Sequence, residues 1–250
     1  MACAPVTARH GEMAESSSVE LRAEFLAGTA AGAAAGFAVA PFASAVDKAL
    51  AENASGRASL RESFFGTMKS VFSRPATFFR SPAFAWIWLV YGSTYAAANL
   101  VESACAKKKV DATLPKWVAT SGVNTSTNIC KDRAFAKMFG ASVPVSVPVG
   151  SYASWLGRDV VTMGVVFTLP PVVGKHLAGV AGSERAGTLA AQFALPLVMQ
   201  FVTTPLHLLG YDFYNNPNGG PADRLKFLQK DYLKNVGLRM MRMVPWVANN

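Results

Sequence analysis

Five charged side chains lie within or beside the most apolar parts of this chain: Asp132, Arg158, Asp159, Arg239 and Arg242. In a membrane protein, a charge that faces a water-filled cavity can bind an ionic substrate or help to close a gate. Arg239 and Arg242 are three residues apart, so on a helix they share one face and could present two guanidinium groups to an anion. These five residues are therefore the candidate cavity or gate residues.

Two of these charge groups also have a purely structural explanation. Arg158 and Asp159 precede an uncharged segment, where an arginine commonly anchors a helix end by extending its charge to water. Asp132 stands between Lys131 and Arg133, and the three could form a charge cluster at the membrane surface. Both interpretations stay open at the level of the sequence.

The two arginines near the end of the chain have an alternative as well. Instead of facing a substrate or a lipid headgroup, Arg239 and Arg242 could pair with Asp132, Asp159 or Asp212 inside a helix bundle. Such pairing would make them structural residues.

Further polar residues lie in apolar surroundings. His207 is expected to be a polar residue at a helix end rather than a proton relay. Asn124, Ser126 and Asn128 could line a cavity, or they could form hydrogen bonds between helices.

A glycine-rich segment is the first of the elements that must position these charges. Residues 25–48 are mostly apolar, with Gly28, Gly32 and Gly36 at every fourth position. Glycines at this spacing lie on one side of a helix and allow a second helix to approach closely, as in membrane proteins. The segment is therefore predicted to be a membrane helix with a small-residue packing face.

Four more segments have the length or the composition of membrane helices. Residues 83–101 carry no charge, and a helix of this length spans a hydrocarbon core about 30 Å thick. Residues 160–174 and 187–206 are also uncharged. Residues 117–138 and 232–250 are weaker candidates because they contain charges. Only 16% of all residues are charged, against about 25% in soluble domains, which favours a membrane protein.

The charge and the cysteine content of the chain argue against a nucleic-acid-binding protein and against a metal site. The net charge of +9 arises from basic residues between and beside the apolar segments, which favours contact with a lipid bilayer, including anionic lipid, and not with nucleic acid. Cys3, Cys105 and Cys130 have no metal-ligand spacing, and no catalytic or phosphate-binding motif is present. We therefore expect no metal, no cofactor and no enzymatic activity.

The order of the segments suggests an internal repeat. Residues 1–21 form a polar tail that contains several acids, unlike a cleaved mitochondrial leader. The remaining chain, 22–250, divides into three helix pairs at about 22–105, 116–176 and 186–250. The first pair encloses an amphipathic segment, LRESFFGTMKSVF, that is predicted to lie at the membrane interface.

This layout resembles the mitochondrial carrier family, whose members contain three repeats of two membrane helices. The resemblance is carried by FLAG at residues 25–28, by Pro41 with Phe42, and by the spacing of Arg239, Arg242 and Pro245. In that family a P-x-[DE]-x-x-[KR] motif kinks each odd helix and supplies the charges of a gate. The resemblance implies helix kinks at Pro41 and Pro205.

The gate motif itself is largely lost. Ala43 and Val46 follow Pro41 where an acid and a base are expected, and His207 and Gly210 take the same positions after Pro205. In the second repeat Asp132 keeps the acidic position, while Cys130 replaces the proline and Phe135 replaces the base. Residues further along the chain could form a shifted set of charges: Asp47, Lys48 and Asp212.

The sequence thus predicts an all-α integral membrane bundle of about six helices in three pseudo-repeats, with the third pair shortened. The leading functional interpretation is a carrier-like multi-spanning protein of a mitochondrial membrane, the inner rather than the outer. It would act by association with other membrane proteins or lipid, and not by ordinary metabolite exchange. One alternative is an atypical solute transporter with a shifted charge gate. The other is an accessory membrane subunit of a respiratory or import complex.

Overall fold

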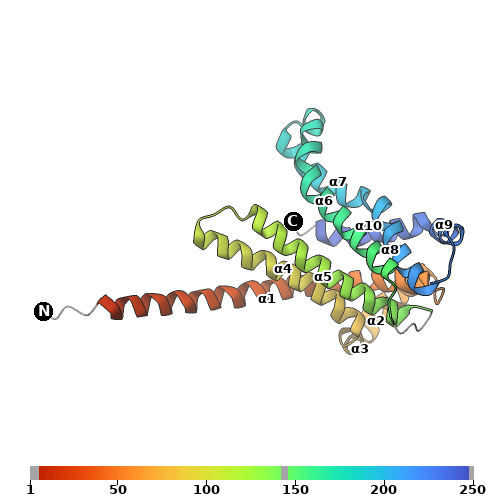
Figure 1. Ribbon diagram of the computed structural model, residues 1–250, viewed down its shortest axis with the longest axis horizontal. Coiled ribbons are helices and arrows are strands. Elements are labelled where there is room, and N and C mark those ends of the chain that lie inside the picture. Colours follow the sequence, from red (N-terminus) through yellow and green to blue (C-terminus); the bar gives the residue numbers. More distant parts are fainter. Residues whose placement is uncertain (1–5, 142–145, 248–250) are drawn as a thin grey trace.

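The computed structural model describes residues 6–141 and 146–247, and this part of the chain is all-α, as predicted (Figure 1). The described residues form ten helices: α1 (Val6–Ala54), α2 (Leu60–Ser73), α3 (Pro75–Phe79), α4 (Pro82–Lys108), α5 (Thr113–Phe139), α6 (Val149–Ala181), α7 (Glu184–Val198), α8 (Gln200–Asn215), α9 (Pro221–Gln229) and α10 (Tyr232–Val247). α1 thus begins inside the segment expected as a tail. Residues 1–5, which include Cys3, lie outside the described residues.

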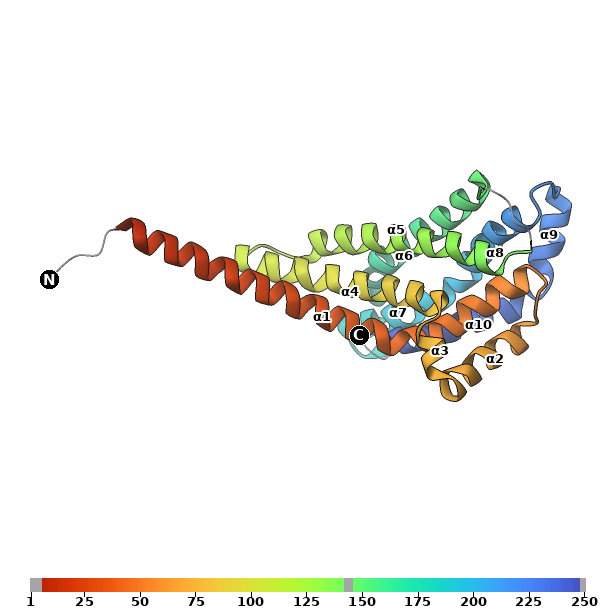
Figure 2. The ribbon, with the colours of Figure 1, turned by 90° about the horizontal axis from the view of Figure 1, so that it is seen from below.

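α1 and α4 run side by side along the narrow part of the molecule, with α5 next to α4 (Figures 1 and 2). The contact between α1 and α4 is close because glycines remove the side chains that would separate them. A Cβ atom on Gly32 would lie 2.5 Å from the backbone nitrogen of Ala96, and one on Gly36 would lie 2.6 Å from that of Gly92. At Gly28 the nearest atom, Asn99 Cβ, is 3.2 Å away.

The broad end of the molecule contains the short helices and most of the hydrophobic core. Ser59 caps the start of α2 by accepting a hydrogen bond from the Glu62 amide, and Ser81 caps α4 in the same way. α2 buries Phe64 and exposes Phe65 and Phe72. Its position at a membrane interface stays a prediction.

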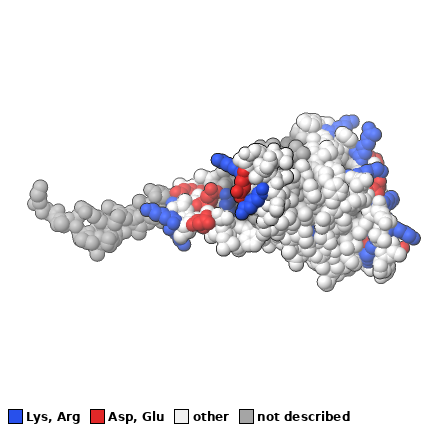
Figure 3. All heavy atoms as spheres, turned by 90° about the horizontal axis from the view of Figure 1, so that it is seen from above, with Lys and Arg blue, Asp and Glu red and all other residues white. Residues whose placement is uncertain are grey.

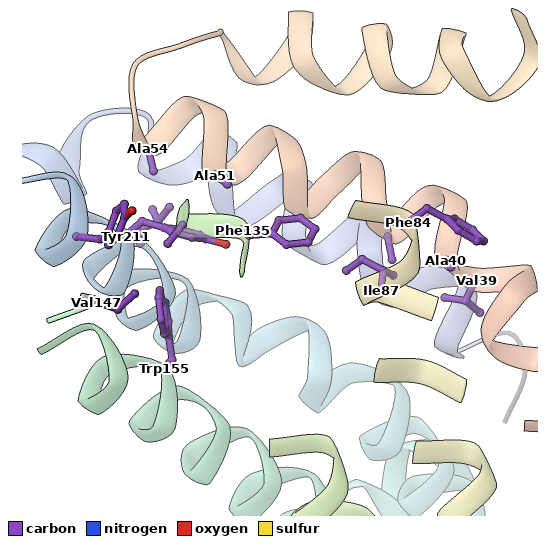
Figure 4. Close-up of a cluster of buried hydrophobic side chains, with 14 of the residues drawn as sticks. Val39, Ala40, Ala51, Ala54, Phe84, Ile87, Phe135, Val147, Trp155 and Tyr211 are labelled. Atoms are coloured by element: carbon purple, nitrogen blue, oxygen red, sulfur yellow. The ribbon is translucent and has the colours of Figure 1, made fainter. Parts of the chain in front are cut away.

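The core at this end is built from aromatic, aliphatic and small residues of six helices: α1, α3, α4, α5, α6 and α8 (Figure 4). Trp155 of α6 is fully buried and packs edge-on against Tyr211 of α8, with ring centroids 5.7 Å apart. Gly210 makes this approach feasible, because a Cβ atom there would lie 2.1 Å from Trp155 Nε1. The packing of α6 on α8 places Arg158, one turn after Trp155, beside His207, one turn before Tyr211.

Two stretches of the described chain are long and apolar enough to cross a membrane: Ala23–Ala54, and Glu184–Asn215, which comprises α7 and α8. A third candidate is α6, if its halves Val149–Val166 and Thr168–Ala181, bent by 41° to each other, form one broken span. The chain is therefore a multi-pass membrane protein. α4 is not among these candidates, although residues 83–101 carry no charge.

The distribution of surface charge agrees with a membrane setting. On the face drawn in Figure 3, charged side chains gather in two areas, one on the narrow part up to its junction with the broad body and one at the far edge of the broad body, and the surface between them is almost free of charge. The described chain thus supports the coarse prediction of an all-α membrane protein, with ten helices and two or three candidate spans in place of six spanning helices. The arrangement in three pseudo-repeats stays a prediction.

Candidate functional site

Charged side chains from four helices meet in the interior of the bundle, and each of them is at most 8% exposed. We call this group the buried charge network: Asp47 of α1, Lys131 and Asp132 of α5, Arg158 and Asp159 of α6, and Arg239 and Arg242 of α10. It contains all five charged residues singled out from the sequence. The structure therefore places these charges inside the protein rather than at a membrane surface.

Asp47 joins three helices at one end of the network. Its Oδ2 atom lies 2.6 Å from Lys131 Nζ, and its Oδ1 atom lies 2.7 Å from Arg242 Nη1. Arg242 also donates a hydrogen bond from Nε to the Tyr91 hydroxyl on α4, at 3.3 Å. Both carboxylate oxygens of Asp47 are thus paired, and the pairs hold α1 against α5 and α10.

Asp132 continues the network toward α6. Lys131 Nζ lies 2.9 Å from Asp132 Oδ1, and Arg158 Nη1 lies 2.6 Å from Asp132 Oδ2. Arg158 in turn contacts the carboxylate of its neighbour Asp159 at 2.8 Å. The ion pairs therefore form an unbroken chain from α10 through α1 and α5 to α6. Removing one member of such a chain leaves its partner charged and buried, which is strongly unfavourable.

His207 of α8 borders the network and is fully buried. Its Nδ1 atom lies 2.5 Å from Arg158 Nη1. A guanidinium group can only donate hydrogen bonds, so Nδ1 must be the acceptor and the ring proton must sit on Nε2. His207 Nε2 has no hydrogen-bond partner among the described residues. His207 is thus a neutral ring with one free donor.

Arg239 differs from the other basic groups of the network. It is 4% exposed, and its Nε atom donates to the side-chain oxygen of Gln200, at 3.0 Å. It forms no ion pair with a carboxylate of the described chain, and its Nη1 atom has no hydrogen-bond partner there. The network holds four basic and three acidic groups, so one positive charge is in excess. Arg239 carries that charge.

Helical spacing explains how the sequence assembles these groups. Asn235, Arg239 and Arg242 follow one another at four and three residues, so they share one face of α10. Lys131 and Asp132 lie on the buried face of α5 with Phe135, one turn further along. Each charged group therefore points inward because its helix buries that face.

The remaining residues singled out from the sequence lie apart from the network. Pro41 and Pro205 lie inside α1 and α8, and the predicted kinks stay predictions. Asp212 pairs with Arg224 at the broad end of the molecule. Asn124 donates a hydrogen bond to Thr94 of α4, which agrees with the interhelical alternative for this residue.

Sequence reasoning did not select Asp47, Lys131 and His207 as site residues. The sequence places Asp47 only in a possible shifted set of charges, and it predicts a helix-end position for His207. Asp47 could have been selected from the sequence, because it follows a long uncharged segment and a buried acid in such a helix needs a partner inside the protein. Lys131 was noted only beside Asp132. Among the described residues, no group of His, Cys, Asp and Glu side chains could hold a metal ion.

A comparison with protein-family models matches residues 31–246 to the family described as probable citrulline exporter. The match spans most of the chain and includes every residue of the buried charge network. The chain belongs to the probable citrulline exporter family. No curated protein and no solved structure gives a significant match.

This finding overturns the family and the leading function predicted from the sequence. The chain is not a mitochondrial carrier, and the interpretation as a carrier-like protein that acts by association is wrong. The resemblance misled because glycine-rich helices, prolines and helix pairs recur in many membrane proteins, while the specific gate motif was largely lost. Membership of an exporter family indicates a transporter rather than an enzyme.

Proposed function

We propose that this chain exports citrulline across a membrane. The observation that carries the proposal is the buried charge network, which lies within the matched region of an exporter family and crosses the interior of a multi-pass membrane protein. Buried ionisable groups in membrane proteins commonly mark the pathway of a polar substrate. The family description supplies the substrate.

The chemistry of citrulline fits such a network. At neutral pH citrulline carries one carboxylate, one ammonium group and an uncharged ureido group, so it needs partners of both signs and no net countercharge. The network offers both signs within a few ångström, at Asp132, Arg158 and Asp159. A zwitterion that replaces protein ion pairs with its own keeps every buried charge paired, which avoids the cost of exposing single charges to a low dielectric.

The ion pairs also provide a means of coupling substrate to conformation. They tie α1 and α10 to α5 and α6 through Asp47, Lys131 and Asp132. A substrate that competes for these side chains would loosen the contacts and favour a second arrangement of the helices. Export then follows if the second arrangement opens to the opposite side of the membrane.

Several finer predictions belong with this proposal. We retain the three pseudo-repeats and a surface contact with anionic lipid as hypotheses about the chain. The prediction of a mitochondrial membrane rested on the resemblance to the carrier family, and this chain belongs to a different family. The proposal therefore names a membrane and no organelle.

The test is transport by the purified full chain in liposomes. Liposomes loaded with labelled citrulline should release it faster with the protein than without it. Unlabelled citrulline on the inside should slow release of the label, whereas urea, which lacks both charges, should not. Release no faster than from protein-free liposomes would contradict the proposal.

A further inference from the structure

Two polar helix faces meet beside the network, on α8 and α10. On α8 the residues are Gln200, Thr203, Thr204 and His207, at spacings that place them on one face, and none is more than 1% exposed. On α10 the facing residues are Asn235 and Arg239. The two helices contact each other, and the hydrogen bond from Arg239 to Gln200 joins the two faces.

The free polar atoms between these helices are two nitrogen donors, one hydroxyl and one acceptor, Asn235 Oδ1. Arg239 Nη1 and His207 Nε2 have no partner in the described chain, and both nitrogens carry hydrogen. The Thr204 hydroxyl, between Gln200 and His207 on the same face, is also without a partner. Buried donors without acceptors are unfavourable, so these groups favour a ligand that accepts hydrogen bonds.

The charge of this region selects the type of acceptor. Arg239 carries the excess positive charge of the network and has only a neutral amide as its partner. The paired arginines already hold carboxylates: Arg158 holds Asp132 and Asp159, and Arg242 holds Asp47. Arg239 is the arginine of the network that can accept a further carboxylate without breaking an ion pair.

We infer that Arg239, with the free donors of His207 and Thr204, binds the carboxylate of the transported amino acid. A carboxylate is an acceptor-only group with room for several donors, and it neutralises the excess charge. This inference rests on the proposed function for the identity of the substrate. It adds that the carboxylate, and not the amine or the side chain, is the group recognised between α8 and α10.

Three related compounds test this assignment in equilibrium binding to the purified full chain. Citrulline has both charges, 5-ureidopentanoate keeps the carboxylate but lacks the amine, and citrullinamide keeps the amine but lacks the carboxylate. Loss of a charge-assisted contact to a buried arginine should weaken binding of citrullinamide about tenfold or more relative to 5-ureidopentanoate. Equal binding of these two compounds, or binding of neither, would overturn the inference.

Substitutions at Arg239 add a second test. Arg239→Gln should remove the preference for the carboxylate compound, and Arg239→Lys should keep a weakened preference because it retains the charge. Arg133→Gln is the matched control, since Arg133 is exposed and lies beside the network in sequence only. If Arg239→Gln keeps the full preference, Arg239 does not bind the carboxylate. If Arg239→Gln does not fold, Arg239→Lys and the wild-type comparison still decide.

Export assays separate this inference from the proposed function. If 5-ureidopentanoate binds through Arg239 but citrulline is not released from liposomes, the carboxylate site stands and the proposed function fails. If citrulline is exported but citrullinamide competes as well as 5-ureidopentanoate, the proposed function stands and the carboxylate site fails.

Discussion

The two ends of helix α1 use opposite means to hold their neighbours. Toward the N-terminus, Gly32 and Gly36 bring the α1 backbone against α4, and the ion pair between these two helices, Glu24 with Lys107, lies at the exposed surface. Toward the C-terminus, Asp47 holds α5 and α10 through two buried ion pairs. The first contact depends on shape and has one arrangement. The second depends on side chains whose partners a charged ligand can replace.

This difference separates a fixed part of the molecule from a part that can change. Backbone atoms in close contact cannot shift without separating the helices. Ion pairs, in contrast, can be exchanged when another charge arrives, provided that no charge is left alone. We therefore assign stability to the α1–α4 contact and substrate handling to the network, and the variants below are chosen to test that division.

The largest loss of stability is expected from Asp47→Asn. This change leaves Lys131 and Arg242 buried without their shared carboxylate, and loss of one partner in a buried pair costs about 3 to 5 kcal/mol. Denaturant unfolding of the purified protein in detergent measures the effect. The double variant Asp47→Asn with Arg242→Met removes the cation that is left without a carboxylate, since Lys131 still pairs with Asp132, and it should recover part of the loss. Wild-type stability in the single variant would contradict the pairing.

A smaller loss is expected from Gly32→Ala in the fixed region. The added Cβ atom would collide with the backbone at Ala96, and overpacking of this kind costs about 1 to 3 kcal/mol. Gly122→Ala on α5 is the control, because a Cβ atom at Gly122 meets no atom within 4 Å. Alanine favours the helix over glycine, so the control should be as stable as wild type or slightly more. Equal effects at both positions would argue against the close contact.

Tyr91→Phe probes the edge of the network. It removes the hydroxyl that accepts from Arg242 Nε but leaves the ion pair to Asp47, so it should cost about 0.5 to 1.5 kcal/mol. Tyr95→Phe is the control, because the Tyr95 hydroxyl is buried without a partner and its removal should not destabilise. The difference between the two unfolding midpoints measures the contribution of the hydrogen bond.

The smallest effect is expected at the surface. Glu102 and Lys116 form an ion pair at 2.6 Å, but their side chains are 60% and 41% exposed. Solvent screens such pairs, so Glu102→Gln should change stability by less than about 0.5 kcal/mol. A loss comparable to that of Asp47→Asn would show that burial does not set the strength of ion pairs in this protein.

The sequence predicted the elements better than their assembly. Helical spacing and low charge located the helices around Gly32 and Asp132, and the two arginines singled out beside apolar segments, Arg158 and Arg239, are buried. The ion pairs of the network could not be predicted from the sequence. Asp47, for example, pairs with Lys131 and Arg242, which lie 84 and 195 residues away in the chain. Only packing of the helices brings them together.

The prediction of function failed for a related reason. The layout of glycines, prolines and helix pairs reflects how helices pack in a membrane, and it does not distinguish one family from another. The sequence likewise predicts only a helix-end role for His207. Its contact with Arg158 joins two different helices, so no spacing of neighbouring residues indicates it. The proposed carboxylate site depends on which charge remains unpaired after folding, and the sequence alone does not reveal that pairing.

The most direct test of the account is release of labelled citrulline from liposomes that contain equal amounts of wild-type protein, Arg239→Gln or Arg133→Gln. The account predicts that wild type and Arg133→Gln release citrulline at similar rates, and that Arg239→Gln releases it no faster than protein-free liposomes. Release at the wild-type rate by a folded Arg239→Gln protein would contradict the assignment of substrate handling to the buried charge network.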